Sequence, residues 1–169
     1  MKIALIVVGV LVLLIVGVVV IGALLPKRHV VARSAAFKTS PEKLYALIDG
    51  DQSWRPDVKA CEVFSEDRKQ FQRETSRNGQ TVLYALQDAR PPIGITRRIA
   101  TEGLPYGGSW SFVLEPADGG TRVRITEDGE VYNPVFRFVS KFVMGQTAML
   151  DAYLKAMGKA TGEDVRTGD

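Results

Sequence analysis

The sequence predicts an α+β protein in which one transmembrane helix precedes a domain whose antiparallel sheet curves around a long C-terminal helix. Three observations lead to this prediction. Residues 3–25 form an unbroken apolar run. The middle of the chain alternates apolar and polar residues between turn-forming pairs, which is typical of antiparallel strands. Residues 135–157 then place apolar side chains at helical spacing.

The N-terminal run predicts a single-pass anchor in the cell membrane. A helix of its 23 residues is about 35 Å long, and the hydrocarbon core of a bilayer is about 30 Å thick. A cleavable signal peptide is the rival interpretation, with residues 21–23 as a weak cleavage site, but its apolar region usually spans only about 7–15 residues. Gly9, Gly17 and Gly22 are not spaced as G-x-x-x-G, so no dimerisation face is expected.

The basic excess of the chain lies beside this run. The net charge is +3, but five of the 22 basic residues precede residue 39, which leaves 17 basic and 19 acidic residues in the rest. A nucleic-acid partner is not expected, because it would need basic residues clustered on the folded domain. Lys27, Arg28 and Arg33 are the expected membrane-surface residues, as a stop-transfer flank or as contacts to anionic head groups worth about 1 kcal/mol each. Basic flanks favour the cytoplasmic side, so the domain is expected in the cytoplasm.

The expected organisation has three parts. Residues 1–29 form the anchor and its basic flank, residues 30–160 a single domain, and residues 161–169 a polar tail that frays. Hairpin turns are expected at Asn78-Gly79 and at residues 118–120, and a plain turn at residues 105–108. Strands are expected at residues 30–37, 60–64, 70–76, 81–87, 95–101, 109–115 and 121–131.

Two helices are expected to accompany the strands. Residues 39–42 are a typical helix start, because Glu42 follows three residues after the capping candidate Thr39. Residues 133–134 start the C-terminal helix, whose apolar stripe continues for about six turns. Gly145 lies within it, and because glycine weakens a helix by about 1 kcal/mol it is expected to mark a close packing point.

Three segments and the terminal helix have a familiar pattern: residues 39–45 (TSPEKLY) with Trp54 soon after, residues 110–116 (WSFVLEP) and residues 121–127 (TRVRITE). Together they resemble the START-like superfamily, also called SRPBCC, and within it the polyketide cyclase/dehydrase-like group. The resemblance covers about residues 30–160. It implies a helix-grip fold, with an apolar cavity under the long helix for a lipid, a polyketide-like ring system or another hydrophobic small molecule. Members of this superfamily share the pocket rather than catalytic residues, so no active site is carried over.

The residues expected to line this cavity are the large apolar side chains of the strand at 109–115 and of the terminal helix. They are Trp110, Phe112, Phe138, Phe142, Met149 and Tyr153. The plainer interpretation of the same stripe is ordinary packing of the helix on the sheet.

Catalytic chemistry has few candidates. His29 is the only histidine and stands at the membrane boundary, so a histidine-dependent base inside the domain is not expected, nor is a metal site or a cofactor. Glu127 is the one catalytic candidate, because strand alternation from Val123 turns it inward, where burial would raise its pKa. The alternative is that the strand bulges near Gly129 and its carboxylates meet solvent or arginine partners.

Three functions remain open. The first is a membrane-tethered domain that binds a lipid or other hydrophobic small molecule. The second is a cyclase/dehydrase-like enzyme, which two or more ionisable residues converging in the cavity would favour. The third is a module that docks a protein partner at the membrane, which a filled core with an exposed apolar patch would favour. Ligand identity and oligomeric state are not determined by the sequence.

Overall fold

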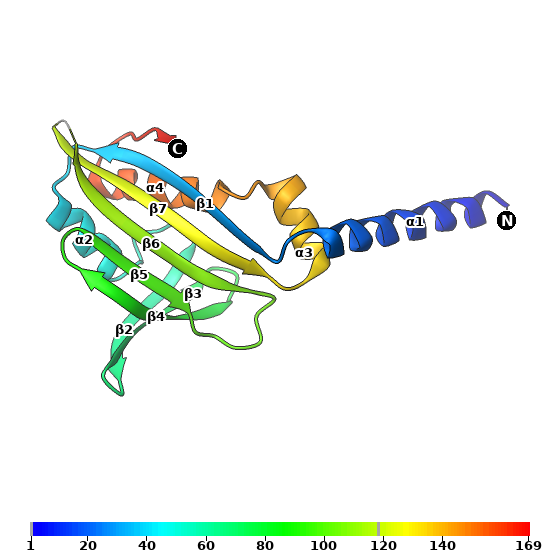
Figure 1. The fold of residues 1–169 in the computed structure, drawn as a ribbon, viewed down its shortest axis with the longest axis horizontal. Helices are drawn as coiled ribbons and strands as arrows, with labels where there is room; N and C mark the ends of the chain where they lie inside the picture. Colours follow the sequence, from blue (N-terminus) through cyan, green and yellow to red (C-terminus); the bar gives the residue numbers. More distant parts are fainter. Residues whose placement is uncertain (1, 118) are drawn as a thin grey trace.

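The computed structural model describes residues 2–117 and 119–169. It has the predicted α+β class, with an antiparallel sheet curved around a C-terminal helix and a long helix projecting from one end (Figure 1). The helical elements are α1 (Lys2–Leu24), α2 (Pro41–Asp49), α3 (Pro134–Val139), the π-helical turn η1 (Ser140–Met144) and α4 (Ala148–Thr161). The strands are β1 (Arg28–Phe37), β2 (Val58–Glu66), β3 (Lys69–Ser76), β4 (Thr81–Arg90), β5 (Gly94–Ile99), β6 (Tyr106–Ala117), β7 (Gly120–Val131) and β8 (Thr167–Gly168).

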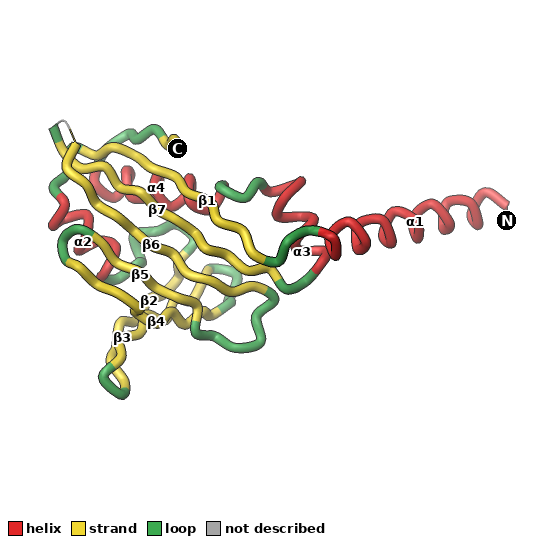
Figure 2. The backbone as a smooth tube through the Cα atoms, viewed as in Figure 1, coloured by secondary structure: helices red, strands yellow, loops and turns green. Residues whose placement is uncertain are grey.

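The sheet has the order β2-β3-β4-β5-β6-β7-β1-β8, and every neighbouring pair is antiparallel (Figure 2). The expected meander therefore runs from β2 to β7, and β1 joins its far side. Gly79 has a φ of 88°, as the predicted Asn78-Gly79 turn requires. The other predicted hairpin turn includes Asp118, which lies outside the described residues, but β6 and β7 pair on either side of it.

The plain turn expected at residues 105–108 is instead the beginning of β6. Tyr106 pairs with Val131, and Gly108 lies opposite Gly129. A Cβ atom at Gly108 would overlap the Asp128 carbonyl, and the φ of Gly108 is +119°. The two glycines thus allow close approach of β6 and β7 rather than a reversal of the chain.

The prediction of one continuous C-terminal helix is wrong. The chain forms α3 and η1, breaks at Gly145, and resumes as α4. Gly145 has a φ of +79° and nothing lies within contact distance of the place a Cβ would occupy, so it is a helix break and not a close packing point. Before the break, α3 lies away from the sheet and packs against α1. Helical spacing along the sequence cannot predict this contact, because it is made between distant segments.

Helix α1 is long and apolar enough to cross a membrane. Within its described length only Gly17, Val18 and Gly22 are covered, and α3 is the element that contacts it. Gly22 is buried, and a Cβ at this position would overlap the Pro134 carbonyl. Gly22, which is part of no dimerisation motif, therefore allows close packing of α1 on α3 within the same chain.

The polar tail is ordered rather than frayed. The Glu163 carboxylate accepts hydrogen bonds from the backbone N–H groups of Lys38 (2.6 Å) and Thr39 (3.1 Å) and from the Thr39 hydroxyl (2.6 Å). Val165 is buried, and β8 pairs with β1. Ser40, rather than the capping candidate Thr39, occupies the N-cap position of α2.

The main core fills the space between α2, α4 and the concave face of the sheet. Its side chains are almost wholly excluded from solvent, which is the main source of folding free energy. The largest of them are Leu44, Ile48, Ile95, Leu114, Ile125, Leu150, Leu154 and Met157.

Truncating this core should destabilise the domain. Leu154→Ala is expected to lower the free energy of unfolding by about 2–5 kcal/mol, because the Leu154 side chain on the inner face of α4 is fully buried. Urea titration of the full-length protein in detergent micelles, followed by tryptophan fluorescence, measures this change. The neighbouring exposed change Lys155→Ala is the control and should stay within about 0.5 kcal/mol of the wild type. Equal effects of the two changes would contradict the assignment of the core.

Candidate functional site

Aromatic side chains gather around Tyr153 on the inner face of α4. The Tyr153 ring lies 5.3 Å from Trp54, 5.8 Å from Trp110 and 5.3 Å from Phe112, centroid to centroid. The Trp54 and Trp110 contacts are edge-to-face, a preferred geometry of aromatic pairs. Three of the expected cavity residues, Trp110, Phe112 and Tyr153, therefore contact one another between the concave face of the sheet and α4.

The other three expected cavity residues lie elsewhere. Phe138 on α3 and Phe142 on η1 contact each other outside the sheet, with ring centroids 4.9 Å apart and the rings tilted by 47°. Phe142 is 57% exposed, and Met149 at the start of α4 is 62% exposed. They share a helical stripe with Tyr153 in the sequence, but the break at Gly145 separates α3 and η1 from α4.

Hydrogen bonds hold the phenol of Tyr153 in one orientation. Its hydroxyl donates to the Gln52 side-chain oxygen over 2.9 Å, and burial raises the Tyr153 pKa. The Gln52 amide nitrogen donates in turn to the carbonyls of Leu47 (2.8 Å), Ile48 (3.0 Å) and Gly50 (3.0 Å). Gln52 is fully buried, so it ties the aromatic group to the end of α2.

An ion pair lies beside this group. Arg55 reaches Glu74 over 3.0 Å, and its guanidinium stands 5.1 Å from the Tyr153 ring centroid. Burial raises the pKa of Glu74, although the charge of Arg55 opposes the shift. Arg55 and Glu74 are 19 residues apart on a loop and on β3, and no sequence motif links them. Only the fold reveals this pair.

Glu127 and His29 form a second ionisable pair on the inner side of β7 and β1. The Glu127 carboxylate lies 3.5 Å from His29 Nε2, opposite Trp110 in the strand register. Burial raises the pKa of Glu127, and the contact with His29 partly offsets this. The expectation that the sole histidine stands apart from the domain is wrong, because β1 begins at Arg28 and carries His29 onto the sheet.

The neighbouring carboxylates have other partners. Asp128 pairs with Arg28 over 2.5 Å, and this hydrogen bond lowers the pKa of Asp128. Glu130 accepts a hydrogen bond from the Tyr132 hydroxyl over 2.8 Å. The arginine-partner interpretation thus fits Asp128, whereas Glu127 faces inward with its histidine.

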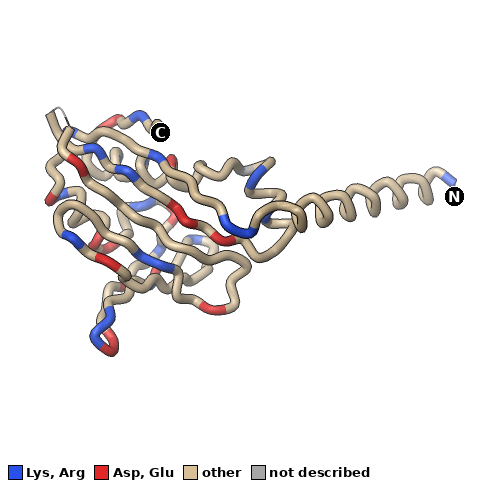
Figure 3. The backbone as a smooth tube through the Cα atoms, in the orientation of Figure 1, with Lys and Arg blue, Asp and Glu red and all other residues tan. Residues whose placement is uncertain are grey.

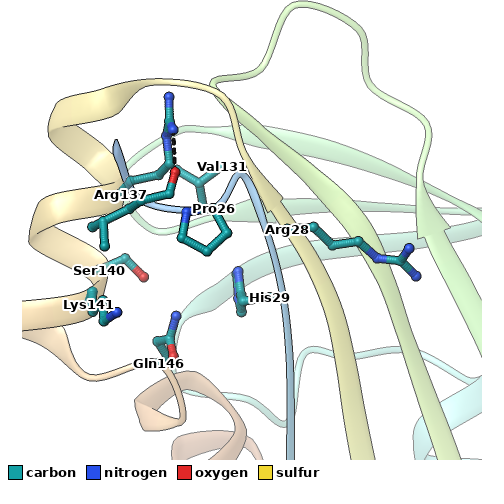
Figure 4. A pocket seen from close by; sticks show the side chains of 9 residues that line it. Pro26, Arg28, His29, Val131, Arg137, Ser140, Lys141 and Gln146 are labelled. Carbon is teal, nitrogen blue, oxygen red and sulfur yellow. Dashed lines mark hydrogen bonds between the residues drawn. The ribbon is translucent and has the colours of Figure 1, made fainter. Parts of the chain in front are cut away.

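A small pocket of about 40 Å³ adjoins this pair at the junction of α1 with the domain (Figure 4). Pro26, His29, Ser140 and Gln146 surround it, while Arg28 points away toward the outer face of the sheet. A volume of about 40 Å³ suits little more than one water molecule, and drug-sized ligands need about 300 Å³ or more. His29 both lines the pocket and contacts Glu127, so a ligand at the pocket would be next to the inner carboxylate.

Arg137 joins the pocket to the end of α1. It is only 8% exposed, and its guanidinium donates to the carbonyls of Leu25 (2.7 Å), Ala23 (3.4 Å) and Tyr132 (3.4 Å). The last carbonyls of a helix lack partners within the helix, and a cation there also complements the helix dipole. The sequence pattern offered no signal for this role, because Arg137 is not among the residues of the apolar stripe.

The predicted membrane-surface residues have different surroundings. Lys27 is exposed, and Arg28 is exposed but paired with Asp128. Arg33 instead lies over the start of α4, where it pairs with Asp151 (3.3 Å) and Asp169. Figure 3 shows α1 free of charge between Lys2 and the basic residues at its junction with the domain.

A second, broad and open depression of about 510 Å³ lies between α2 and the β2–β3 hairpin. Among the described residues, no three His, Cys, Asp or Glu side chains are grouped as metal ligands.

Comparison with known proteins shows the family. Residues 28–161 match the model of the family described as polyketide cyclase / dehydrase and lipid transport, so the chain belongs to that family. The fold is of the START-like, SRPBCC kind, which commonly binds hydrophobic ligands. A search of curated proteins gives no match.

Solved structures share this fold at low sequence identity. A START superfamily protein from Mycobacterium smegmatis is 16% identical with a TM-score of 0.63, over 79% of this chain and 97% of that chain. A protein from Mesorhizobium loti is 13% identical with a TM-score of 0.61, over 79% and 97% of the two chains. A conserved protein from Geobacillus kaustophilus is 15% identical with a TM-score of 0.58, over 82% and 100%. At this identity the likeness concerns the fold alone.

The Glu127 carboxyl should leave a signature in the pH dependence of stability. Its folded pKa is raised above the ordinary value of 4.5, so the folded state binds the proton more tightly than the unfolded state. Stability from this group is complete below pH 4.5 and is lost as pH rises through the folded pKa. Glu127→Gln should therefore reduce the fall in melting temperature that the wild type shows above pH 4.5. Glu115→Gln, at an exposed position of β6, is the control. Identical pH profiles for the wild type and Glu127→Gln would contradict the burial of this carboxyl.

Proposed function

We propose that this protein is a single-pass membrane protein whose START-like domain binds a lipid or other hydrophobic small molecule at the cytoplasmic membrane surface. The observation that carries the proposal is the position of the pocket directly beside the end of α1, with His29 and Glu127 behind it. A bilayer around α1 would bring hydrophobic molecules to that position at high local concentration. The family description, which includes lipid transport, agrees with a ligand of this class.

A retained anchor is supported by the way α1 is joined to the domain. Gly22 packs on Pro134, and Arg137 donates hydrogen bonds to the carbonyls of Ala23 and Leu25. Cleavage after residue 23 would remove both the Gly22 contact with Pro134 and the Ala23 carbonyl, which is one of the three acceptors of the buried Arg137. The cytoplasmic location rests on the basic residues that follow α1, of which Lys27 and Arg28 remain exposed.

Ligand binding is supported by the partly open inner face of the sheet. Trp110, Glu127 and His29 point inward without being fully buried, and the side chains of His29 and Glu127 keep 16% and 19% of their surface exposed. An aromatic surface next to a carboxyl and an imidazole suits a ligand with an apolar body and a polar group. Adjustment of Gln146 and η1 would enlarge the pocket toward these residues.

Co-purification of a ligand tests the proposal. Full-length protein, extracted in mild detergent, is expected to carry a defined lipid or ring compound by native mass spectrometry combined with lipidomics. Trp110→Ala and the milder His29→Gln should each lower the bound amount about tenfold, or about 1.4 kcal/mol. Ile93→Ala, an exposed apolar change on the turn after β4, is the matched control and should bind as the wild type does. The same lipids in the same amounts on all four proteins would indicate only detergent-resistant annular lipid and would overturn the proposal.

A second function, a cyclase/dehydrase-like enzyme, is favoured by one observation. Glu127 and His29 are two ionisable groups that converge on the inner face at 3.5 Å, and an acid with a raised pKa suits proton transfer near neutral pH. Such an enzyme would move a proton between Glu127 and a bound substrate while His29 stabilises the carboxylate.

Turnover distinguishes the enzyme from the binding protein. The wild type, incubated with the compound that co-purifies, is expected to cyclise or dehydrate it if it is an enzyme, and mass spectrometry detects the product. Glu127→Gln should then keep the ligand bound and unchanged. Absence of a product with the wild type, or equal product with Glu127→Gln, would remove this second function or the role of Glu127 in it.

A further inference from the structure

The α3–η1 segment, residues 134–144, carries an exposed apolar surface. Phe136, Phe142 and Val143 are 53%, 57% and 70% exposed, and Val135 is exposed beside them. The ammonium of Lys141 lies 5.8 Å from the Phe142 ring centroid, at the edge of this surface. Contiguous exposed apolar side chains in so short a segment mark an interaction site rather than ordinary surface.

The segment lies beside the end of α1. Gly17, Val18 and Gly22 are the covered residues of α1, and Gly22 is in contact with Pro134 at the start of α3. From Gly17 to the end of α1 at Leu24 the helix rises about 10 Å. The α3–η1 segment therefore accompanies roughly the last 10 Å of α1 (Figure 1).

The length of α1 determines the depth at which this segment would lie. Its 23 residues measure about 35 Å, which exceeds a hydrocarbon core of about 30 Å by only about 5 Å. A segment that follows the last 10 Å or so of α1 cannot lie wholly outside the bilayer if α1 spans it. Interfacial helices bury their apolar face about 5–10 Å into the boundary between head groups and acyl chains, which matches this depth.

We infer that the occupant of the apolar surface of residues 134–144 is the bilayer itself, and that this segment is a second, interfacial membrane element beside the spanning helix. Phe136, Phe142 and Val143 enter the acyl boundary, while Lys141 extends its ammonium toward the head groups. The inference rests on the proposed function only in requiring that α1 cross the membrane. It does not require that a ligand bind.

The position of the segment has a consequence for the pocket. Ser140 and Lys141 of η1 line the pocket together with Gln146, which follows the break at Gly145. With η1 in the interface, the pocket opens at the bilayer surface rather than into bulk water. A hydrophobic ligand could then pass between the bilayer and the inner face of the sheet without crossing water.

Spin-label depth measurements test the inference on the full-length protein. Cys61 is changed to Ala, and single cysteines are placed at Phe142, Val143, Ile93 and Leu13. The labelled proteins are reconstituted in vesicles of equal parts phosphatidylcholine and phosphatidylglycerol. Ile93 is 52% exposed and lies at the opposite end of the sheet from α1, where β4 turns into β5, so it is the matched control. Leu13, in the middle of α1, reports independently whether the anchor spans the bilayer.

The ratio of oxygen to nickel-chelate collision rates gives the depth of each label. We expect a ratio at Phe142 and Val143 several-fold above that at Ile93 and below that at Leu13. A water-like ratio at Phe142 and Val143 with a high ratio at Leu13 would overturn the inference while leaving the anchor intact. Low collision rates with both reagents, or spin–spin broadening that grows with protein density, would assign the surface to a protein partner or a second copy and also overturn it. A water-like ratio at Leu13 would instead overturn the anchor on which both proposals rest.

Discussion

The hydrogen bonds of Arg137 are the interaction on which the arrangement of this molecule depends. Its planar guanidinium donates to carbonyls at the end of α1 and to Tyr132 at the end of β7, so one buried side chain joins the N-terminal helix to the sheet. The carbonyls need a donor because they end a helix, and the cation needs acceptors because it is buried. Removal of either side leaves the other unpaired. The helix end and the buried cation thus require each other, and Arg137 also lines the pocket between Pro26 and Gln146.

The break at Gly145 follows from the same junction. A continuous helix would cover the inner face of the sheet along its whole length and would leave Gly22 without Pro134 against it. Because the chain turns at Gly145, α4 covers only the half of the sheet where Leu150 and Leu154 pack, and α3 is free to contact α1.

The interior of the grip is therefore mixed rather than uniformly apolar. The half under α4 is filled by side chains, with Tyr153 held by Gln52 and the Arg55–Glu74 ion pair at its edge. Buried polar groups lower stability unless they are paired, and these are paired. The half toward α1 keeps an aromatic surface beside Glu127, where a ligand could supply the missing contacts. The ligand of the proposed function is therefore one oriented, amphipathic molecule.

Local patterns in the sequence were sufficient for the apolar helix, the hairpin at Asn78-Gly79, the alternation that turns Glu127 inward, and the family resemblance, because each depends on neighbours along the chain. The helical period of residues 135–157 also identified Tyr153 as an inward residue. It did not predict the break at Gly145, because spacing along one segment cannot show that α3 packs against α1. Contacts between distant residues were beyond reach: His29 with Glu127, Arg55 with Glu74, and Arg137 with the end of α1. Sequence alone thus determined most of the helices and strands, including the membrane-length apolar helix α1. Tertiary structure decided how that helix is attached and which polar groups face the site, because those outcomes depend on which distant groups need a partner once they are buried.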